Sequence, residues 1–220
     1  MARFEHYRRI AHTRVLRPWA RLALCLAVGA AAAAPPSPAL LVLGDSLSAG
    51  YGLRVEEGWV SLLERRLASQ GYGYRVVNAS VSGETSAGAL ARLPHLLALH
   101  RPRLVLIELG ANDGLRGLPV AALRSNLGEL VKLSQAAGSR VLLIGMRLPR
   151  NYGPRYTEEF YASFATVARE RRTPLVPFLL AGIAGDERNF QTDRLHPLAR
   201  AEGALLDTVW PTLAPLLGPR

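Results

Sequence analysis

Four short polar segments of this sequence contain the residue types that an acyl-transfer reaction needs. A wholly apolar run leads into a turn of Gly44, Asp45 and Ser46, and a serine at the end of a buried strand is either a helix cap or a nucleophile. A serine hydroxyl is a weak nucleophile until a base removes its proton, and His196 is the side-chain type whose pKa suits that task. Asp193 lies three residues before His196, so a tight turn can aim its carboxylate at the imidazole and fix the tautomer.

The same reaction needs fixed hydrogen-bond donors for the negative charge that develops on the carbonyl oxygen. The backbone amides of Ser46 and Gly83 and the side-chain amide of Asn112 could supply three of them. Glycine at position 83 lets the backbone approach a substrate without a Cβ atom in the way. Loss of one such donor typically lowers a rate by about 10²–10³, so the fold has to hold each of them in place.

Five short apolar or β-branched runs predict the strands that would position these groups. The runs alternate with segments of helical periodicity that end at glycine, proline or arginine. The predicted strands cover residues 39–43, 74–79, 103–109, 140–145 and 175–178. The predicted helices cover 59–71, 86–99, 119–137, 156–171 and 198–217, the last broken near Pro211.

This alternation predicts one α/β domain of three layers, in which helices cover both faces of a parallel sheet. Right-handed crossovers favour a doubly wound sheet with the flavodoxin-like strand order 2-1-3-4-5. In that topology the carboxyl ends of all strands share one edge. Ser46, Gly83, Asn112 and His196 each lie past the end of a predicted strand, so we expect them to converge there.

The composition is that of a globular domain with a full core. The chain has 220 residues, of which 49% are hydrophobic and 20% charged. The formal net charge is +10, but residues 1–34 contain six arginines and one glutamate, so half of the surplus belongs to them. The other basic residues are scattered among acids without a basic stripe, which disfavours nucleic acid as a partner.

Residues 1–34 are typical of a signal peptide that is removed. Arginines precede a 13-residue apolar run at 22–34, which is short for a membrane span. A span needs roughly 20 residues, so we expect a periplasmic or secreted protein without a stable membrane anchor, with an uncleaved anchor as the alternative. Cys25 is the only cysteine and lies in this segment, which excludes a disulfide framework and a thiolate site from the rest of the chain.

The polar segments resemble the four sequence blocks of the GDSL, or SGNH, hydrolase family in order and spacing. The matching segments are Gly44-Asp45-Ser46-Leu47, Gly83, Gly110-Ala111-Asn112-Asp113 and Asp193-x-x-His196. The similarity extends from about Leu40 to the last predicted helix, and we expect an SGNH hydrolase domain over 38–218. Residues 78–86, 109–117 and 147–153 are similar to the periplasmic, multifunctional acyl-CoA thioesterases, which are also known as lysophospholipases or arylesterases.

The resemblance implies a role for each matching residue. Ser46 would be the nucleophile, His196 the base and Asp193 the acid that orients it, with Gly83 and Asn112 as oxyanion donors beside the amide of Ser46. It also implies hydrolysis of small acyl esters or thioesters through an acyl-enzyme, lysophospholipids among the candidates. We expect no cofactor, no metal and a monomer.

Position 111 departs from the family pattern. The related group often has a second glycine where this chain has Ala111. The difference adds one methyl group, and we expect no loss of activity.

Two segments beside the predicted site could contact an acyl chain. Residues 114–119 combine glycines with Leu115 and Leu118 next to Asn112, and we interpret them as a mobile lip, with a plain connection as the alternative. Residues 146–149, which include Leu148, and Tyr152 would form the opposite wall.

The same sequence features are also compatible with other functions and with purely structural roles. A carbohydrate or lipid O-deacetylase of the same fold is one alternative, and a non-catalytic flavodoxin-like binding domain is another. The binding domain is disfavoured because no phosphate-cradling glycine pattern with a lysine occurs. We expect Asp45 to hold its turn through hydrogen bonds to the backbone, Glu108 to be structural, and Asp113 to be structural or an adjacent polar contact.

Overall fold

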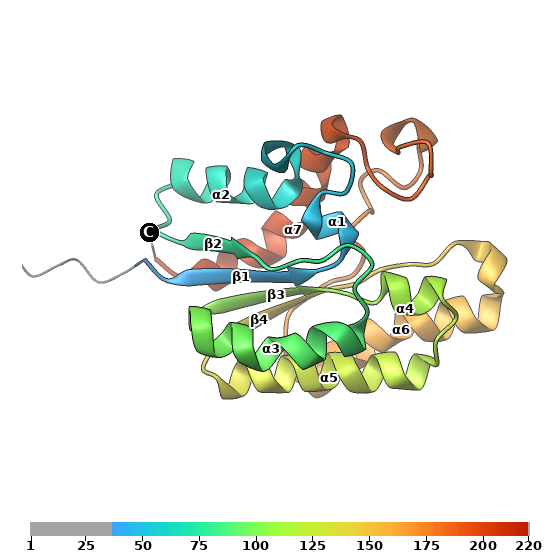
Figure 1. Ribbon diagram of the computed structural model, residues 1–220, viewed down its shortest axis with the longest axis horizontal. Coiled ribbons are helices and arrows are strands. Elements are labelled where there is room, and N and C mark those ends of the chain that lie inside the picture. The colour runs from blue at the N-terminus through green and yellow to red at the C-terminus, as the bar shows by residue number, and fades with distance from the viewer. Residues whose placement is uncertain (1–36, 220) are drawn as a thin grey trace, which may run out of the picture. The chain divides into compact units, whose positions relative to one another are not determined.

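The structure of the protein is a computed structural model that describes residues 37–219. These residues form a five-stranded sheet with helices on both faces (Figure 1). The strands are β1 (Ala39–Gly44), β2 (Arg75–Asn78), β3 (Leu104–Glu108), β4 (Arg140–Ile144) and β5 (Leu175–Val176). The signal peptide predicted for residues 1–34 lies outside the described residues.

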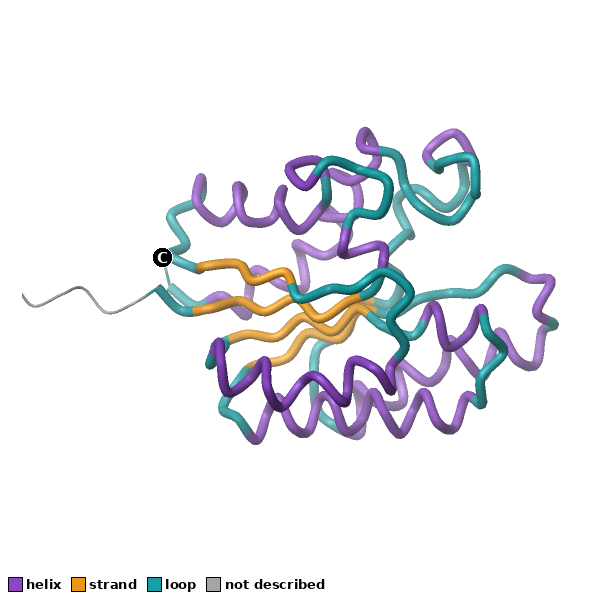
Figure 2. The backbone as a smooth tube through the Cα atoms, in the orientation of Figure 1, coloured by secondary structure: helices purple, strands orange, loops and turns teal. Residues whose placement is uncertain are grey.

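The sheet has the predicted topology. Its order is β2-β1-β3-β4-β5, and all neighbouring strands pair in parallel. Val42 of β1 lies opposite Asn78 of β2 on one side and Leu106 of β3 on the other. The doubly wound, flavodoxin-like order 2-1-3-4-5 is therefore confirmed. Loops that follow the strands gather at one end of the sheet, as Figure 2 shows.

Helices form the two outer layers. The long helices are α2 (Trp59–Ser69), α3 (Ser86–His100), α5 (Val120–Ala136), α6 (Pro154–Glu170) and α7 (Glu202–Leu217). Helices α2 and α7 cover one face of the sheet, and α3, α5 and α6 cover the other (Figure 1). Two short helices, α1 (Ser46–Ala49) and α4 (Ala111–Leu115), follow β1 and β3 closely. Single 3₁₀ turns lie at Val55–Glu57, Arg150–Tyr152, Glu187–Asn189 and Ala199–Ala201.

The central strands are buried because both faces of the sheet are covered. Every residue of β1 and β3 is buried, which explains why both strands are nearly continuous apolar runs. Trp59, Phe160 and Phe164 are the largest fully buried side chains. The two phenylalanines of α6 meet edge to face with ring centroids 5.4 Å apart.

The last helix differs from the prediction, because it is not broken near Pro211. Helix α7 continues through Pro211 and Pro215. A proline removes one backbone hydrogen bond and favours a kink. Val209 and Leu213 are fully buried on a helix that packs against β4, β5 and α2, and this packing holds the helix together across both prolines.

Proline also decides two other boundaries. Strand β5 ends at Val176 rather than at residue 178, since Pro177 has no N–H group to donate to the ladder. Helix α6 begins at Pro154 rather than at residue 156, because proline is well suited to the first turn of a helix.

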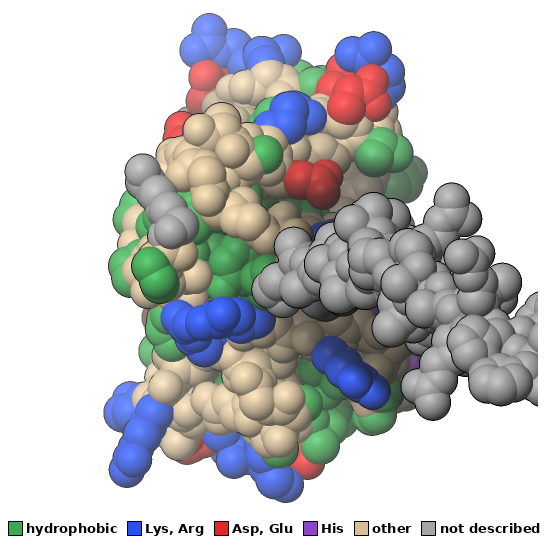
Figure 3. Space-filling view, turned by 90° about the vertical axis from the view of Figure 1, so that its left-hand side faces the viewer, with side chains coloured by type: hydrophobic (Ala, Val, Ile, Leu, Met, Phe, Trp, Pro, Cys, Tyr) green, Lys and Arg blue, Asp and Glu red, His purple; other side chains and the backbone are tan. Residues whose placement is uncertain are grey.

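Charge is dispersed on the face at the amino ends of the strands. On the part of that face that Figure 3 shows uncovered, the Lys and Arg side chains occur in separate groups, some of them beside Asp or Glu. Within residues 37–219, no helix combines the length and the apolar character that a membrane crossing requires.

Candidate active site

The segment after β1 places Ser46 at the amino end of a short helix. Asp45 caps α1, because its Oδ1 atom accepts a hydrogen bond of 3.0 Å from the amide of Leu47. Gly50 ends the helix in a left-handed conformation with φ of 74°. Ser46 is thus the first residue of the helix, and the expected role of Asp45 in the turn is confirmed.

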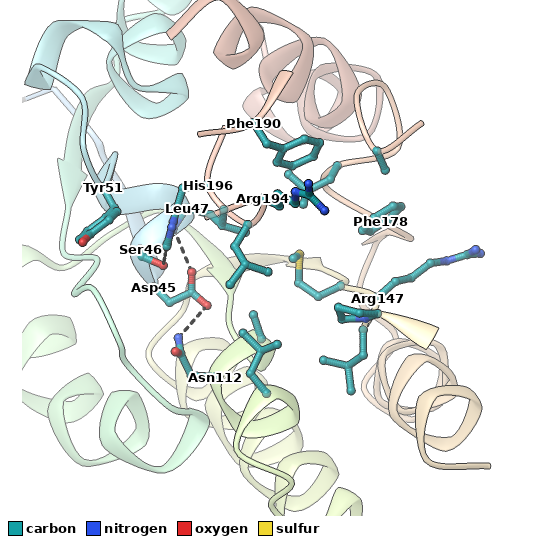
Figure 4. Close-up of a pocket in the computed structure, with 18 of the residues that line it drawn as sticks. Asp45, Ser46, Leu47, Tyr51, Asn112, Arg147, Phe178, Phe190, Arg194 and His196 are labelled. Atoms are coloured by element: carbon teal, nitrogen blue, oxygen red, sulfur yellow. Dashed lines mark hydrogen bonds between the residues drawn. The ribbon is translucent and has the colours of Figure 1, made fainter. Parts of the chain in front are cut away.

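The structure brings Ser46, His196 and Asp193 together in one chain of hydrogen bonds. The Nε2 atom of His196 lies 2.8 Å from Oγ of Ser46, although 150 residues separate them in sequence. The Nδ1 atom lies 2.7 Å from Oδ2 of Asp193. Figure 4 shows the imidazole of His196 beside the Ser46 hydroxyl at one end of a pocket.

The loop that carries Asp193 fixes this carboxylate in place. Its Oδ1 atom accepts hydrogen bonds from the amides of Leu195 and His196, at 2.9 and 3.0 Å. Partial burial by itself raises the pKa of Asp193, but the hydrogen bonds from the His196 ring and from these amides outweigh it and lower the pKa to about 2. Asp193 is therefore a carboxylate at neutral pH and can stabilise a protonated imidazole.

Arg194 and Tyr51 complete the surroundings of the imidazole. Arg194, between Asp193 and His196, has a φ of 58°, in the left-handed region that favours glycine. This conformation turns the chain so that the carboxylate of Asp193 can bond the ring of His196, three residues later. Tyr51 packs against His196 with ring centroids 4.5 Å apart and planes at 38°. The ring of His196 is thus held by a carboxylate, a hydroxyl and an aromatic face.

The three predicted oxyanion donors lie around the same end of the cleft. Ser46, Gly83 and Asn112 all line it. Gly83 has a φ of 81°, and its carbonyl accepts a hydrogen bond of 2.9 Å from Nη2 of Arg116. Within residues 37–219, the backbone amides of Ser46 and Gly83 donate to no protein acceptor. Both amides are therefore available to a bound oxygen atom.

Glycine at position 110 lets the loop after β3 deliver Asn112. Gly110 has a φ of 118°, and a Cβ atom there would lie 3.1 Å from side-chain atoms of Leu123 and Phe164. Helix α4 begins at the next residue, so Asn112 faces the cleft from its first turn. Asn112 donates a hydrogen bond of 3.3 Å to Oδ2 of Asp45.

Two acids near the site are buried and bond neighbouring segments, which fits the structural role expected for them. Asp113 accepts hydrogen bonds of 2.8 and 2.5 Å from the amide and the hydroxyl of Ser86, and so ties α4 to the start of α3. Glu108 is fully buried at the end of β3 and accepts a hydrogen bond of 2.7 Å from Ser48. Burial and the nearby charge of Asp45 raise the pKa of Glu108 well above its usual value.

A cleft of about 720 Å³ extends from the Ser46 end, with mainly apolar walls. Leu115 lines it, as predicted, and so does the whole of 146–149, including Leu148. Phe178 and Phe190 line its far part, where Figure 4 also places Arg147. The guanidinium of Arg147 lies 5.6 Å from the ring centroid of Phe178.

Two of the predicted substrate contacts lie elsewhere, because they belong to the support of the 115–118 loop. Leu118 and Tyr152 do not line the cleft. The hydroxyl of Tyr152 donates to the carbonyl of Leu115 at 3.0 Å, and that of Tyr156 donates to the carbonyl of Leu118 at 2.7 Å. The loop is therefore tied to the segment around the start of α6, which fits the plain connection better than a free lip.

Sequence reasoning missed several residues of the cleft. Tyr51, Phe190 and Arg194 line it from irregular loops, where neither helical nor strand periodicity assigns a side chain to a face. Phe178 also lines it, from the loop after β5, where a strand was predicted. The only signal that could have identified these four residues is that each lies close in sequence to a predicted strand end or to the Asp193 segment.

Comparison with known proteins gives a consistent result. A sequence model of the GDSL-like Lipase/Acylhydrolase family matches residues 42–202. The chain is 53% identical to "Esterase TesA" of Pseudomonas aeruginosa over 193 residues, which cover 88% of this chain and 96% of that protein. It is 43% identical to "Thioesterase 1/protease 1/lysophospholipase L1" of Escherichia coli K12 over 178 residues, 81% of this chain and 84% of that protein.

A solved structure is similar over the same region. The esterase EstA from Pseudoalteromonas sp., in a form inhibited by monoethylphosphonate, aligns with a TM-score of 0.78 and 45% identity. The alignment covers 82% of this chain and 99% of that one.

Proposed function

The chain belongs to the GDSL-like Lipase/Acylhydrolase family, and we propose that it is an exported serine hydrolase that cleaves carboxylic esters and thioesters through an acyl-enzyme. The resemblance to GDSL or SGNH esterases and thioesterases, first noted in the sequence, is confirmed by the relatives. The observation that carries the mechanism is the hydrogen-bond chain from Ser46 through His196 to Asp193 at the end of an apolar cleft.

In the first half of the proposed reaction, Oγ of Ser46 attacks the carbonyl carbon of the substrate. His196 takes the hydroxyl proton at Nε2, which lies 2.8 Å from Oγ. Asp193 keeps the proton on Nδ1 and stabilises the imidazolium that forms. The imidazolium then gives its proton to the departing alcohol or thiol, and the acyl group remains on Ser46.

In the second half, water replaces the leaving group. His196 removes a proton from the water, whose oxygen attacks the acyl carbon, and the proton passes to Oγ of Ser46 as the carboxylic acid departs. In both halves the carbonyl oxygen becomes negative, and the amides of Ser46 and Gly83 with Nδ2 of Asn112 would stabilise it. These are the roles that we propose for the five residues.

The residues that line the cleft favour a substrate with an acyl group. Leu115, Met146, Leu148 and Phe178 offer apolar surface to a hydrocarbon chain or an aromatic ring. A sugar deacetylase would need more polar groups along the cleft, so small acyl esters and thioesters are the proposed substrates. Lysophospholipids are a candidate among them, in view of the name of the Escherichia coli relative.

The mechanism given uses no cofactor. Export is proposed from the sequence of residues 1–34. Mass spectrometry of protein recovered from the periplasm or medium tests export. A chain that lacks this segment is the expected result, and an intact chain retained inside the cell would contradict it.

A fluorophosphonate probe tests the nucleophile. We expect labelling of the wild type and of Ser82→Ala, a matched control at another serine that lines the cleft, but not of Ser46→Ala. Hydrolysis of p-nitrophenyl esters and acyl thioesters by Ser46→Ala should fall by at least about 10³-fold. Labelled or fully active Ser46→Ala would refute the proposal. A preference for acetyl over every longer chain would favour the deacetylase.

A further inference from the structure

Asp45 uses its two carboxylate oxygens for two different partners. Oδ1 accepts the hydrogen bond from the amide of Leu47 that caps α1, whereas Oδ2 accepts a hydrogen bond of 3.3 Å from Nδ2 of Asn112. The residue has 0% exposed surface, so bulk water does not compete for Oδ2. This second hydrogen bond joins the loop after β1 to helix α4 at the end of the cleft (Figure 4).

The chemistry of the two groups fixes which end of the Asn112 amide faces Asp45. A carboxylate only accepts hydrogen bonds, whereas a side-chain amide has a donating NH₂ end and an accepting oxygen end. A reversed amide would place its oxygen against Oδ2 of Asp45 in a buried position, which is costly. The NH₂ group has two hydrogens, so one can bond Asp45 while the other serves a substrate.

We propose that Asp45 is a positioning residue that keeps the NH₂ group of Asn112 aimed at the oxyanion. This inference rests on the function proposed above, since an oxyanion donor matters only if Ser46 attacks a carbonyl group. Asp45 acts through Asn112 and not on the substrate. An acceptor at the Oδ2 position is therefore required, and a donor there is worse than no group at all.

Asp45 performs this role as a carboxylate, which sets the pH for the test. Burial raises the pKa of Asp45 to about 6, and the charge of Asp113 adds to the effect, while the accepted hydrogen bonds and the charge on His196 lower it. Glu108 has its pKa raised well above the usual value by burial and by the charge of Asp45, so it stays protonated to higher pH. Measurements at pH 8 report on ionised Asp45.

Two substitutions of Asp45 separate its role as the N-cap of α1 from its role in positioning Asn112. Asp45→Asn keeps an oxygen for the cap but can place an NH₂ group against Asn112, which favours the reversed amide. We expect kcat at pH 8 to fall by about 10²–10³, as after loss of an oxyanion donor, with KM changed less than about twofold. Asp45→Ser keeps a good cap and leaves the amide unrestrained, so a smaller loss of about 10-fold is expected.

A double-mutant cycle with Asn112→Ala tests whether the effect passes through Asn112. In the Asn112→Ala background, Asp45→Asn should lower kcat by less than about threefold, because the group that it misdirects is absent. Additive losses in the cycle would overturn the proposal, as would wild-type kcat in Asp45→Asn. If Asp45→Asn does not fold, the same double-mutant cycle with Asp45→Ser and Asn112→Ala tests the proposal in its place, and additive losses would again overturn it.

Glu202→Gln is the matched control. This carboxyl is also buried, but it bonds the amide of Trp59 and neither Asp45 nor Asn112, so kcat should stay within about twofold of wild type. The two proposals fail in different ways. Activity retained by Ser46→Ala would remove the proposed function, whereas inactive Ser46→Ala together with an additive cycle would remove only the role of Asp45.

Discussion

The side chain of Glu202, at the start of α7, caps helix α2 at Trp59. Its Oε2 atom accepts a hydrogen bond of 2.7 Å from the Trp59 amide, across 143 residues of sequence. Gly58, which precedes α2, has no side chain to do so. Glu202 is only 1% exposed, so a carboxyl that carries charge in water is enclosed between two helices.

This enclosure predicts how stability depends on pH. Burial raises the pKa of Glu202 from 4.5 to about 7, against the lowering effect of the Trp59 hydrogen bond. Between these two values the folded chain holds a proton that the unfolded chain has lost. The contribution to stability is thus fully present below pH 4.5 and is lost as the pH rises through about 7.

Urea denaturation at pH 5 and pH 8 measures this effect. We expect the free energy of unfolding to fall by up to about 3 kcal/mol from Glu202, and the raised pKa values of Asp45 and Glu108 to add changes in the same direction. In Glu202→Gln the difference in unfolding free energy between pH 5 and pH 8 should be smaller by the contribution of Glu202. Glu129→Gln, which removes a surface pair with Lys132, is the control and should keep the full difference. An equal pH dependence in Glu202→Gln and wild type would contradict the assignment.

Asp193→Asn tests the orienting role of the carboxylate. The amide can keep the backbone hydrogen bonds of the turn but can no longer stabilise the imidazolium, so kcat should fall by about 10²–10⁴. Steady-state kinetics with a p-nitrophenyl ester measure the loss. Asp186→Asn, which breaks a surface pair with Arg188, is the control and should be fully active. Comparable activity of the two variants would argue against a role for Asp193.

The left-handed conformation of Arg194 predicts an unusual order of stabilities. At a φ of 58° a Cβ atom is strained, so Arg194→Gly should be more stable than Arg194→Ala by about 1 kcal/mol. The order should reverse at Arg200, in the 3₁₀ turn Ala199–Ala201, where glycine only adds flexibility. Thermal denaturation of the four variants measures both differences. An Arg194→Ala variant as stable as Arg194→Gly, or more stable, would show that residue 194 is not strained.

The lining of the cleft predicts a dependence on acyl length. Leu115→Ala and Leu148→Ala should lower kcat/KM for long-chain esters roughly 10-fold, since each removes apolar contact worth about 0.8 kcal/mol per buried methylene, and should affect acetyl esters little. Leu118→Ala, outside the cleft, should not change the ratio of long-chain to short-chain rates. A loss that is uniform over chain length would reject the idea that these walls hold the acyl chain.

The convergence of residues at the Ser46 end of the cleft could be predicted because it depends on topology. Ser46, Gly83 and Asn112 follow strands directly, and a parallel sheet brings such positions to one edge whatever the helices do. The position of His196 could be predicted for the same reason, and also because it lies three residues after Asp193. The local chemistry of a turn and the order of the strands were sufficient for these residues.

The walls of the cleft depend on contacts that have no local pattern. Phe190 and Arg194 lie in irregular loops, and Tyr152 faces the backbone of Leu115 instead of the cavity. The unbroken helix through Pro211 has a similar cause, because packing against the sheet overrides what the proline alone indicates. Sequence periodicity contains neither kind of information.

The distance in sequence between Ser46 and His196 has a consequence for biosynthesis. The hydroxyl lies in helix α1, just after the first strand of the sheet, and the imidazole lies in the loop before the last helix, so a nascent or unfolded chain has no activated nucleophile. With the export and activity proposed above, the chain would therefore be inert toward esters and thioesters of the cytoplasm until folding is complete.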